Sequence, residues 1–197
     1  MDFTSNSVIA YLIFAVLGLL IFVTYLKDPS HTNKKALFEK LNSEFGAKTD
    51  WFFARFSYHG LEFIVSEPMM NMARIRVTGF KQLRGSFAIY RKVFGQFQIS
   101  PFLWKLTQYF EGTEADNHVI IKADRATTLQ QLRSNEQVWG FLLAVASQSD
   151  VAILTFDSKK KHLDIQGLAL EQVLQNPRVI FDLCAEIFSL LANEVQR

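Results

Sequence analysis

The side chains that could carry acid–base, nucleophilic or metal chemistry are scattered along this chain. The four histidines are His31, His59, His118 and His162, and none has another histidine or a cysteine at the spacing of a metal-ligand motif. The single cysteine, Cys184, falls within an apolar helical pattern, where a buried structural thiol is the usual outcome. We therefore expect no metal, no cofactor and no cysteine nucleophile.

Three aspartates remain as candidates for general acid–base catalysis, and they are Asp116, Asp124 and Asp157. None of them has an acid–base partner at a recognisable spacing in the sequence. No nucleophile elbow, phosphate-binding loop or dinucleotide fingerprint accompanies these aspartates. An enzyme that acts on an anionic substrate close to a membrane is therefore the alternative hypothesis, and a non-enzymatic function is the leading one.

A long segment without acidic residues is the strongest functional signal in the sequence. No aspartate or glutamate occurs between Pro68 and Phe110, whereas the chain beyond Phe110 is net acidic. The basic residues of this segment are Arg74, Arg76, Lys81, Arg84, Arg91, Lys92 and Lys105. Each Lys or Arg near an acidic bilayer contributes about 1 kcal/mol of attraction, so the segment predicts a surface for anionic phospholipid or for a subunit of a membrane complex. The alternative is the solvated face of a half-buried sheet.

Aromatic side chains lie beside these basic residues. Phe102 and Trp104 fall between Pro101 and Lys105, and an apolar cluster beside a basic region is typical of a subunit interface. Basic residues with aromatics also suit nucleic acid, but no RRM-type signature, helix-turn-helix pattern or zinc spacing occurs. We assign Phe102 and Trp104 to a membrane or partner surface, with packing in the core as the alternative, and expect no nucleic-acid partner.

An uncharged apolar segment runs from Val8 to Leu26. At about 1.5 Å per helical residue it spans roughly 28 Å, which is close to the hydrocarbon thickness of a bilayer. The segment predicts a transmembrane helix, and Gly18 within it would allow the close approach of a second helix in an oligomer. All 21 lysines and arginines lie at or beyond Lys27, so the positive-inside rule predicts an external amino terminus and a cytoplasmic remainder.

The expected domain organisation follows from this segment. Residues 1–27 hold the amino-terminal segment and the anchor, residues 28–35 form a short tether, and residues 36–197 form a cytoplasmic domain. A polar, acidic stretch would separate sub-lobes at 36–110 and 118–197.

Alternating apolar and polar residues predict an antiparallel meander in the first sub-lobe. Trp51–Tyr58 and Leu61–Ser66 flank a His59–Gly60 turn, and Met72–Thr78 and Ser86–Val93 continue the period of two.

A Ser-Pro helix-start signal opens Ile99–Phe110, for which the spacing predicts a helix. In the second sub-lobe we expect a strand over His118–Ala123, helices from about Thr127, a hairpin within Asp150–Gln166 and a last helix that begins near Pro177.

These patterns predict an α+β fold class: a single amino-terminal transmembrane helix, then a cytoplasmic domain with an antiparallel β-meander and a lobe of helices and a hairpin. The predicted function is that of a membrane-anchored, non-enzymatic accessory or scaffold subunit. Its cytoplasmic domain would dock on a membrane protein complex, on the anionic inner leaflet, or on both.

Overall fold

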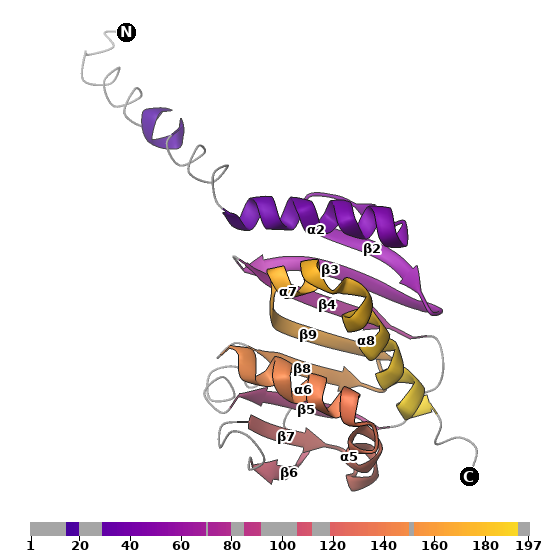
Figure 1. The fold of residues 1–197 in the computed structure, drawn as a ribbon. Helices are drawn as coiled ribbons and strands as arrows, with labels where there is room; N and C mark the ends of the chain where they lie inside the picture. Colours follow the sequence, from indigo (N-terminus) through magenta and orange to yellow (C-terminus); the bar gives the residue numbers. More distant parts are fainter. Residues whose placement is uncertain are drawn as a thin grey trace, which may run out of the picture.

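The computed structural model describes residues 15–19, 29–69, 71–79, 85–91, 106–111, 119–149 and 152–192. Within these ranges the chain has an α+β fold in which nine strands form one antiparallel sheet and the helices pack along one of its faces (Figure 1). The strands are β1 (Lys48–Thr49), β2 (Phe53–Tyr58), β3 (Leu61–Met69), β4 (Met72–Thr78), β5 (Phe87–Arg91), β6 (Thr107–Glu111), β7 (Val119–Ala123), β8 (Ile153–Asp157) and β9 (His162–Ala169). The helices beyond residue 19 are α2 (Pro29–Phe45), α5 (Ala126–Arg133), α6 (Glu136–Gln148), α7 (Leu170–Gln175) and α8 (Pro177–Ala192).

The strand order is β1-β2-β3-β4-β9-β8-β5-β7-β6, and all neighbours run antiparallel. The hairpin expected at His59–Gly60 is present, since Tyr58 pairs with Leu61 and both turn residues have positive φ. The meander ends at β4. The strand expected over Ser86–Val93 is present as β5, but its expected place beside β4 is wrong, because β9 pairs with that edge of β4 and β5 pairs with β7 and β8.

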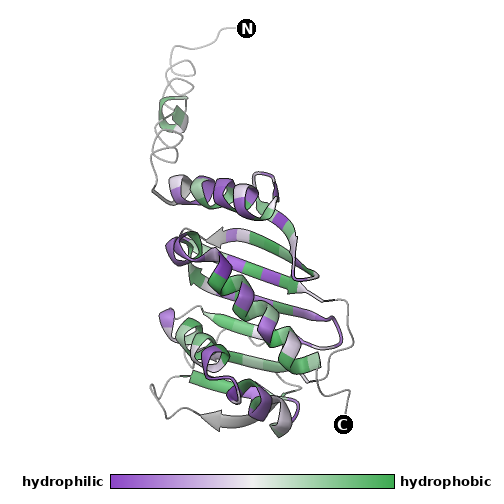
Figure 2. Ribbon diagram, turned by 45° about the vertical axis from the view of Figure 1, so that its right-hand side comes forward, coloured by the Kyte–Doolittle hydropathy of each residue, from purple (hydrophilic) through white to green (hydrophobic). Residues whose placement is uncertain are grey.

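The main core lies between the sheet and the helices. Every second residue of the strands points into it, for example Phe63 in β3, Ile75 in β4 and Phe156 in β8, and all three are fully buried. Figure 2 shows the pattern, with hydrophilic and hydrophobic residues alternating in the strands nearest α2 and mostly hydrophobic residues in β8 and β5. A smaller buried cluster, which includes Ala88 and Tyr90 of β5, forms from the alternate residues.

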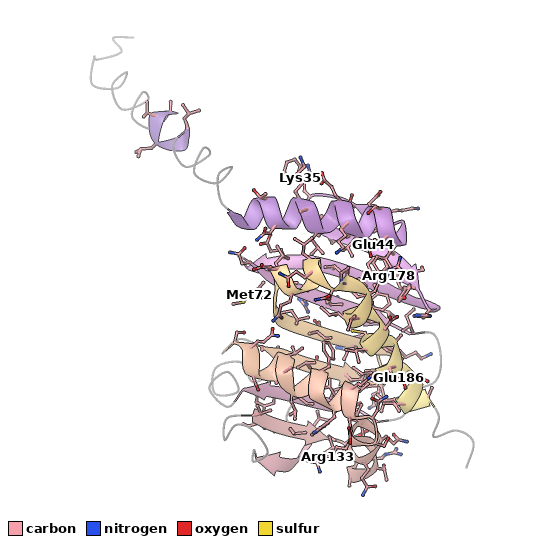
Figure 3. The ribbon with its side chains drawn as sticks, viewed as in Figure 1. Lys35, Glu44, Met72, Arg133, Arg178 and Glu186 are labelled. Atoms are coloured by element: carbon pink, nitrogen blue, oxygen red, sulfur yellow. The ribbon has the colours of Figure 1, made fainter. Side chains whose placement is uncertain are left out.

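Aromatic rings join α2, the sheet and α8. The ring of Phe45, at the end of α2, lies edge-on to the rings of Tyr58 and Phe181, with ring centroids 5.2 Å apart in each pair. Arg178 of α8 and Glu44 of α2 point toward one another above this contact, with Nε and Oε2 3.4 Å apart (Figure 3). These contacts therefore connect α2, which precedes the sheet in sequence, with α8, which follows it.

The expected transmembrane helix is wrong. No helix in the described ranges is both long enough and apolar enough to cross a membrane. Of Val8–Leu26 the structure describes residues 15–19, which include Gly18 and are helical and exposed, while Val8 and Leu26 themselves lie outside the described residues. The single-pass topology and the orientation derived from it are therefore withdrawn.

The helix expected over Ile99–Phe110 is also wrong where the structure describes it. Residues from Thr107 onward form β6, which pairs with β7, and residues 99–105 lie outside the described ranges. Thr, Tyr and Phe favour strands, and the edge of β7 supplies backbone partners. Tertiary pairing therefore decides the conformation at this position.

Candidate functional site

The candidate site lies on the face of the sheet opposite the helices, which we call the open face. In β4 the buried positions are Ala73, Ile75 and Val77, so the residues between them, Arg74 and Arg76, point away from the main core. No described helix packs over this face, which Figure 1 shows as the far side of the sheet; its β5 and β8 part holds the smaller buried cluster, and its β4 part holds the two arginines. The two arginines are thus presented side by side on one strand.

Both arginines bind one carboxylate from a distant part of the chain. Asp164 of β9 lies opposite Arg76 in the strand register. Arg74 Nε donates to Asp164 Oδ1 at 2.8 Å, and Arg74 Nη2 donates to Oδ2, which makes a bidentate pair. Arg76 Nη2 donates to the same Oδ2 at 3.2 Å. We call these three residues the Arg74–Asp164–Arg76 cluster.

The electrostatics of the cluster keep the carboxylate ionised. Burial of Asp164, which is 5% exposed, favours the neutral acid, but the hydrogen bonds and charges of Arg74 and Arg76 outweigh burial and lower its pKa below the usual range. The hydrogen bond to Asp164 likewise raises the pKa of Arg74. At neutral pH the cluster therefore holds two positive charges and one negative charge.

The guanidinium groups are only partly covered. The side chains of Arg74 and Arg76 are 33% and 44% exposed, whereas that of Asp164 is 6% exposed. Arg55 and Glu62 of β2 and β3 form a separate, balanced pair on the same face, with Nε and Oε1 3.5 Å apart. The Arg55–Glu62 pair therefore adds no net charge beside the cluster.

His162 lies two residues before Asp164 on β9 and therefore on the same face of the strand. Burial lowers its pKa, and this effect exceeds the opposing attraction of Asp164 and of Asp157. Because the ring is neutral at neutral pH, His162 adds no charge to the open face.

Of the residues that the sequence assigned to a membrane or partner surface, the structure brings Arg74 and Arg76 together. Arg91 is the last residue of β5. The remaining assigned residues, all outside the described ranges, are Lys81, Arg84, Lys92, Phe102, Trp104 and Lys105. That surface assignment therefore stays a prediction for these residues.

Sequence reasoning missed Asp164. The segment without acidic residues suggested an unopposed basic face, but the sheet brings this carboxylate to it from β9. One feature of the sequence could have revealed it, because Asp164 is an acidic residue between the apolar residues Leu163 and Ile165. The strand that contains them, β9, is mostly buried. A buried acid in such a position needs a positively charged partner.

The aspartates considered for catalysis have structural roles where the structure describes them. Asp124 Oδ1 accepts a hydrogen bond from Thr128 Oγ1 at 3.2 Å, next to the start of α5. Asp157 Oδ1 accepts from the backbone N–H groups of Lys159 and Lys160, at 3.0 and 3.2 Å, and so shapes the β8–β9 turn. Asp116 lies outside the described residues.

The cysteine and the possible metal-ligating side chains form no reactive site among the described residues. Cys184 is fully buried in α8, and burial raises the pKa of its thiol, which disfavours the nucleophilic thiolate. In the described part of the chain, no three His, Cys, Asp or Glu side chains lie close enough together to hold a metal ion.

A second surface lies at the α2 end of the sheet. A groove of about 760 Å³ runs between α2 and the residues from Thr49 to Trp51. Trp51 and Phe52, in the turn between β1 and β2, are each 76% exposed. Large aromatic side chains with this exposure are typical of contact surfaces.

The comparisons with known proteins assign no family. No protein-family model matches the chain, and no curated protein matches its sequence significantly. Among solved structures, the chain is similar to the crystal structure of the mycobacterial trehalose monomycolate transport factor A, TtfA, with a TM-score of 0.46 and 9% identity over 74% of each chain. A likeness of this size assigns neither a fold family nor a function to this chain.

Proposed function

We propose that this protein is a non-enzymatic accessory or scaffold subunit that holds an acidic segment of a partner protein on its open face. The observation that carries the proposal is the Arg74–Asp164–Arg76 cluster, in which two guanidinium groups share one buried carboxylate. The partner would be another subunit of a larger complex.

The chemistry of Arg76 supports an incoming anion. A guanidinium group has five N–H donors in a rigid plane, and one nitrogen of Arg76 donates to Asp164. The other donors are available for a carboxylate, which they can bind in a bidentate way. Because Asp164 already orders the two arginines, the partner loses less binding energy to side-chain ordering.

The distribution of charge favours a protein segment over a lipid surface. Attraction to anionic phospholipid typically uses clusters of about four to eight Lys or Arg residues. Next to the cluster Arg55 is balanced by Glu62, and the cluster itself has one positive charge in excess. Such a site suits one well-placed carboxylate rather than a broad anionic plane.

The test measures binding of a fluorescein-labelled oligoglutamate peptide to the full chain by fluorescence anisotropy at low salt. We expect Arg76→Gln to weaken binding about tenfold, the loss of roughly 1.4 kcal/mol expected for a charge-assisted hydrogen bond. Arg178→Gln is the matched control, because Arg178 is also paired with one carboxylate, Glu44, but lies in the helix layer. This control should bind the peptide as the unchanged protein does.

Two results would contradict the proposal. One is equal binding of the peptide by the Arg76→Gln and Arg178→Gln variants. The other is binding to vesicles of anionic phospholipid that depends on Arg76, with no binding of the peptide, which would identify lipid as the anionic partner.

A further inference from the structure

The groove at the α2 end of the sheet lies away from the Arg74–Asp164–Arg76 cluster and is formed by other elements. One wall is a stripe of α2 that includes Lys35, Phe38 and Asn42, and the other wall is formed by Thr49 and the turn that follows it. Figure 3 places Lys35 on the side of α2 that faces away from the sheet. The groove therefore lies beside β1, at one end of the strand order.

Among the described strands, β1 pairs with β2 alone. β1 pairs with β2, and Asp50 N–H continues the pairing by donating to the Phe53 carbonyl at 3.0 Å. In an antiparallel pair, the residues that bond to the neighbouring strand alternate with residues whose N–H and C=O point the other way. Thr49, which precedes Asp50, is therefore the residue whose backbone donor and acceptor face away from β2.

The turn after Thr49 is held in a fixed shape. Asp50 Oδ1 accepts hydrogen bonds from the backbone N–H groups of Phe52 and Phe53, at 2.7 and 2.9 Å. Trp51 and Phe52 are the two residues that this turn carries outward, each 76% exposed. Aromatic side chains on a rigid turn can anchor a partner at low cost in conformational entropy.

The charges along the groove are balanced within the chain. Lys35 Nζ lies 3.9 Å from Glu39 Oε1, and Lys34 Nζ lies 4.0 Å from Glu67 Oε2. The lining itself holds two lysines, Lys34 and Lys35, and two carboxylates, Glu39 and Asp50, so the groove shows no surplus of either sign to attract a charged segment. An uncharged occupant fits it best.

We infer that this groove binds a short, extended and uncharged segment of a partner protein, which adds to the sheet as a strand beside β1. Backbone hydrogen bonds to Thr49 fix the direction of the segment, and an apolar side chain of the segment packs against Trp51. This site is independent of the proposed function, because no residue of the Arg74–Asp164–Arg76 cluster takes part in it.

The test uses a phage-displayed library of random peptides, selected at high salt on the full-length protein. The enriched sequences are then made as labelled synthetic peptides, and their affinity is measured by fluorescence anisotropy. We expect uncharged sequences in which apolar residues alternate, with affinities that salt does not change.

Two substitutions at one position separate strand addition from other modes of binding. Thr49→Pro removes the N–H that faces away from β2 and leaves the pairing of β1 with β2 intact, since proline is tolerated where an edge N–H faces outward. Thr49→Val keeps that N–H. We expect about a tenfold loss of affinity for Thr49→Pro and none for Thr49→Val.

Trp51→Ala gives a second measurement that does not depend on a change of the backbone. It should also lower the affinity for the peptides about tenfold. Unfolding in urea confirms that each variant is folded. The inference is overturned if the Thr49→Pro and Thr49→Val variants bind alike, if Trp51→Ala has no effect, or if the selection enriches only acidic peptides that Arg76→Gln releases.

Discussion

Arg74 and Asp164 meet across the β4–β9 pair with Nε and Oδ1 2.8 Å apart, although 90 positions separate them in the chain. This contact joins the basic segment without acidic residues to the carboxy-terminal hairpin. It also places a charged carboxylate at a position that is almost fully buried, so its environment should influence stability as well as binding.

Replacing Asp164 should destabilise the fold. Asp164→Asn leaves two adjacent guanidinium groups without a negative charge, and we expect the free energy of unfolding to fall by about 2 kcal/mol, less than for a fully buried pair because both arginines are partly exposed. Glu62→Gln, which disrupts the exposed pair with Arg55, should cost less than about 0.5 kcal/mol. Urea unfolding measures both, and equal losses would show that the cluster has no special role in stability.

His162 should make stability depend on pH. Burial lowers its pKa in the folded state, whereas the unfolded chain has the ordinary value near 6.5. Below that pH the unfolded state binds more protons than the folded state, so stability falls as the pH drops from about 6.5 toward the folded pKa.

The measurement is the urea midpoint across this range for the unchanged protein and for His162→Gln. The decline should be smaller in the variant, because its side chain does not titrate. The same decline in both proteins would assign the pH dependence to other groups.

A side chain at Gly167 should be costly for two reasons. Gly167 has a φ of 84°, and an added Cβ would lie 2.7 Å from the Cα of Ala152. That Cα is a backbone atom, so it cannot rotate out of the way as a side chain can. We expect Gly167→Ala to lower the free energy of unfolding by roughly 3 kcal/mol. Gly46→Ala, at a φ of 63° in open space, has only the conformational cost of about 1 kcal/mol. Similar midpoints for the two variants would contradict this.

Cys184 should report on opening of the core. It is the single thiol of the chain, it is fully buried, and burial raises its pKa. We expect an aromatic disulfide reagent to label the native protein at least ~100-fold more slowly than the chain in urea, because the reagent needs an exposed thiolate. Rapid labelling without urea would show that α8 detaches easily from the sheet.

Local patterns in the sequence predicted most of the individual elements. The His59–Gly60 turn depends on backbone preferences of two residues, and the alternation of Arg74 and Arg76 with apolar neighbours depends on the period of a single strand. Pro177 begins α8 because its fixed φ and missing N–H suit the first turn of a helix. In each case the cause lies within a few residues of the element.

Local patterns failed where a partner from elsewhere in the chain decides the outcome. Short apolar runs fit both periods, so the spacing that predicted a helix through Phe110 could not foresee that β7 would pair with it. The uncharged apolar run from Val8 to Leu26 likewise predicted a transmembrane helix, whereas no helix among the described residues is long and apolar enough to cross a membrane.

The sequence by itself therefore determined the segregation of charge, the strand and helix patterns and the tight turns, since all of these arise from neighbouring residues. Only the tertiary structure decided that β9 lies beside β4, that Asp164 is the carboxylate shared by Arg74 and Arg76, and that Thr49 borders a groove under α2. The physical reason is that pairing and burial depend on which distant segments share an edge or a face, and this depends on the whole chain at once.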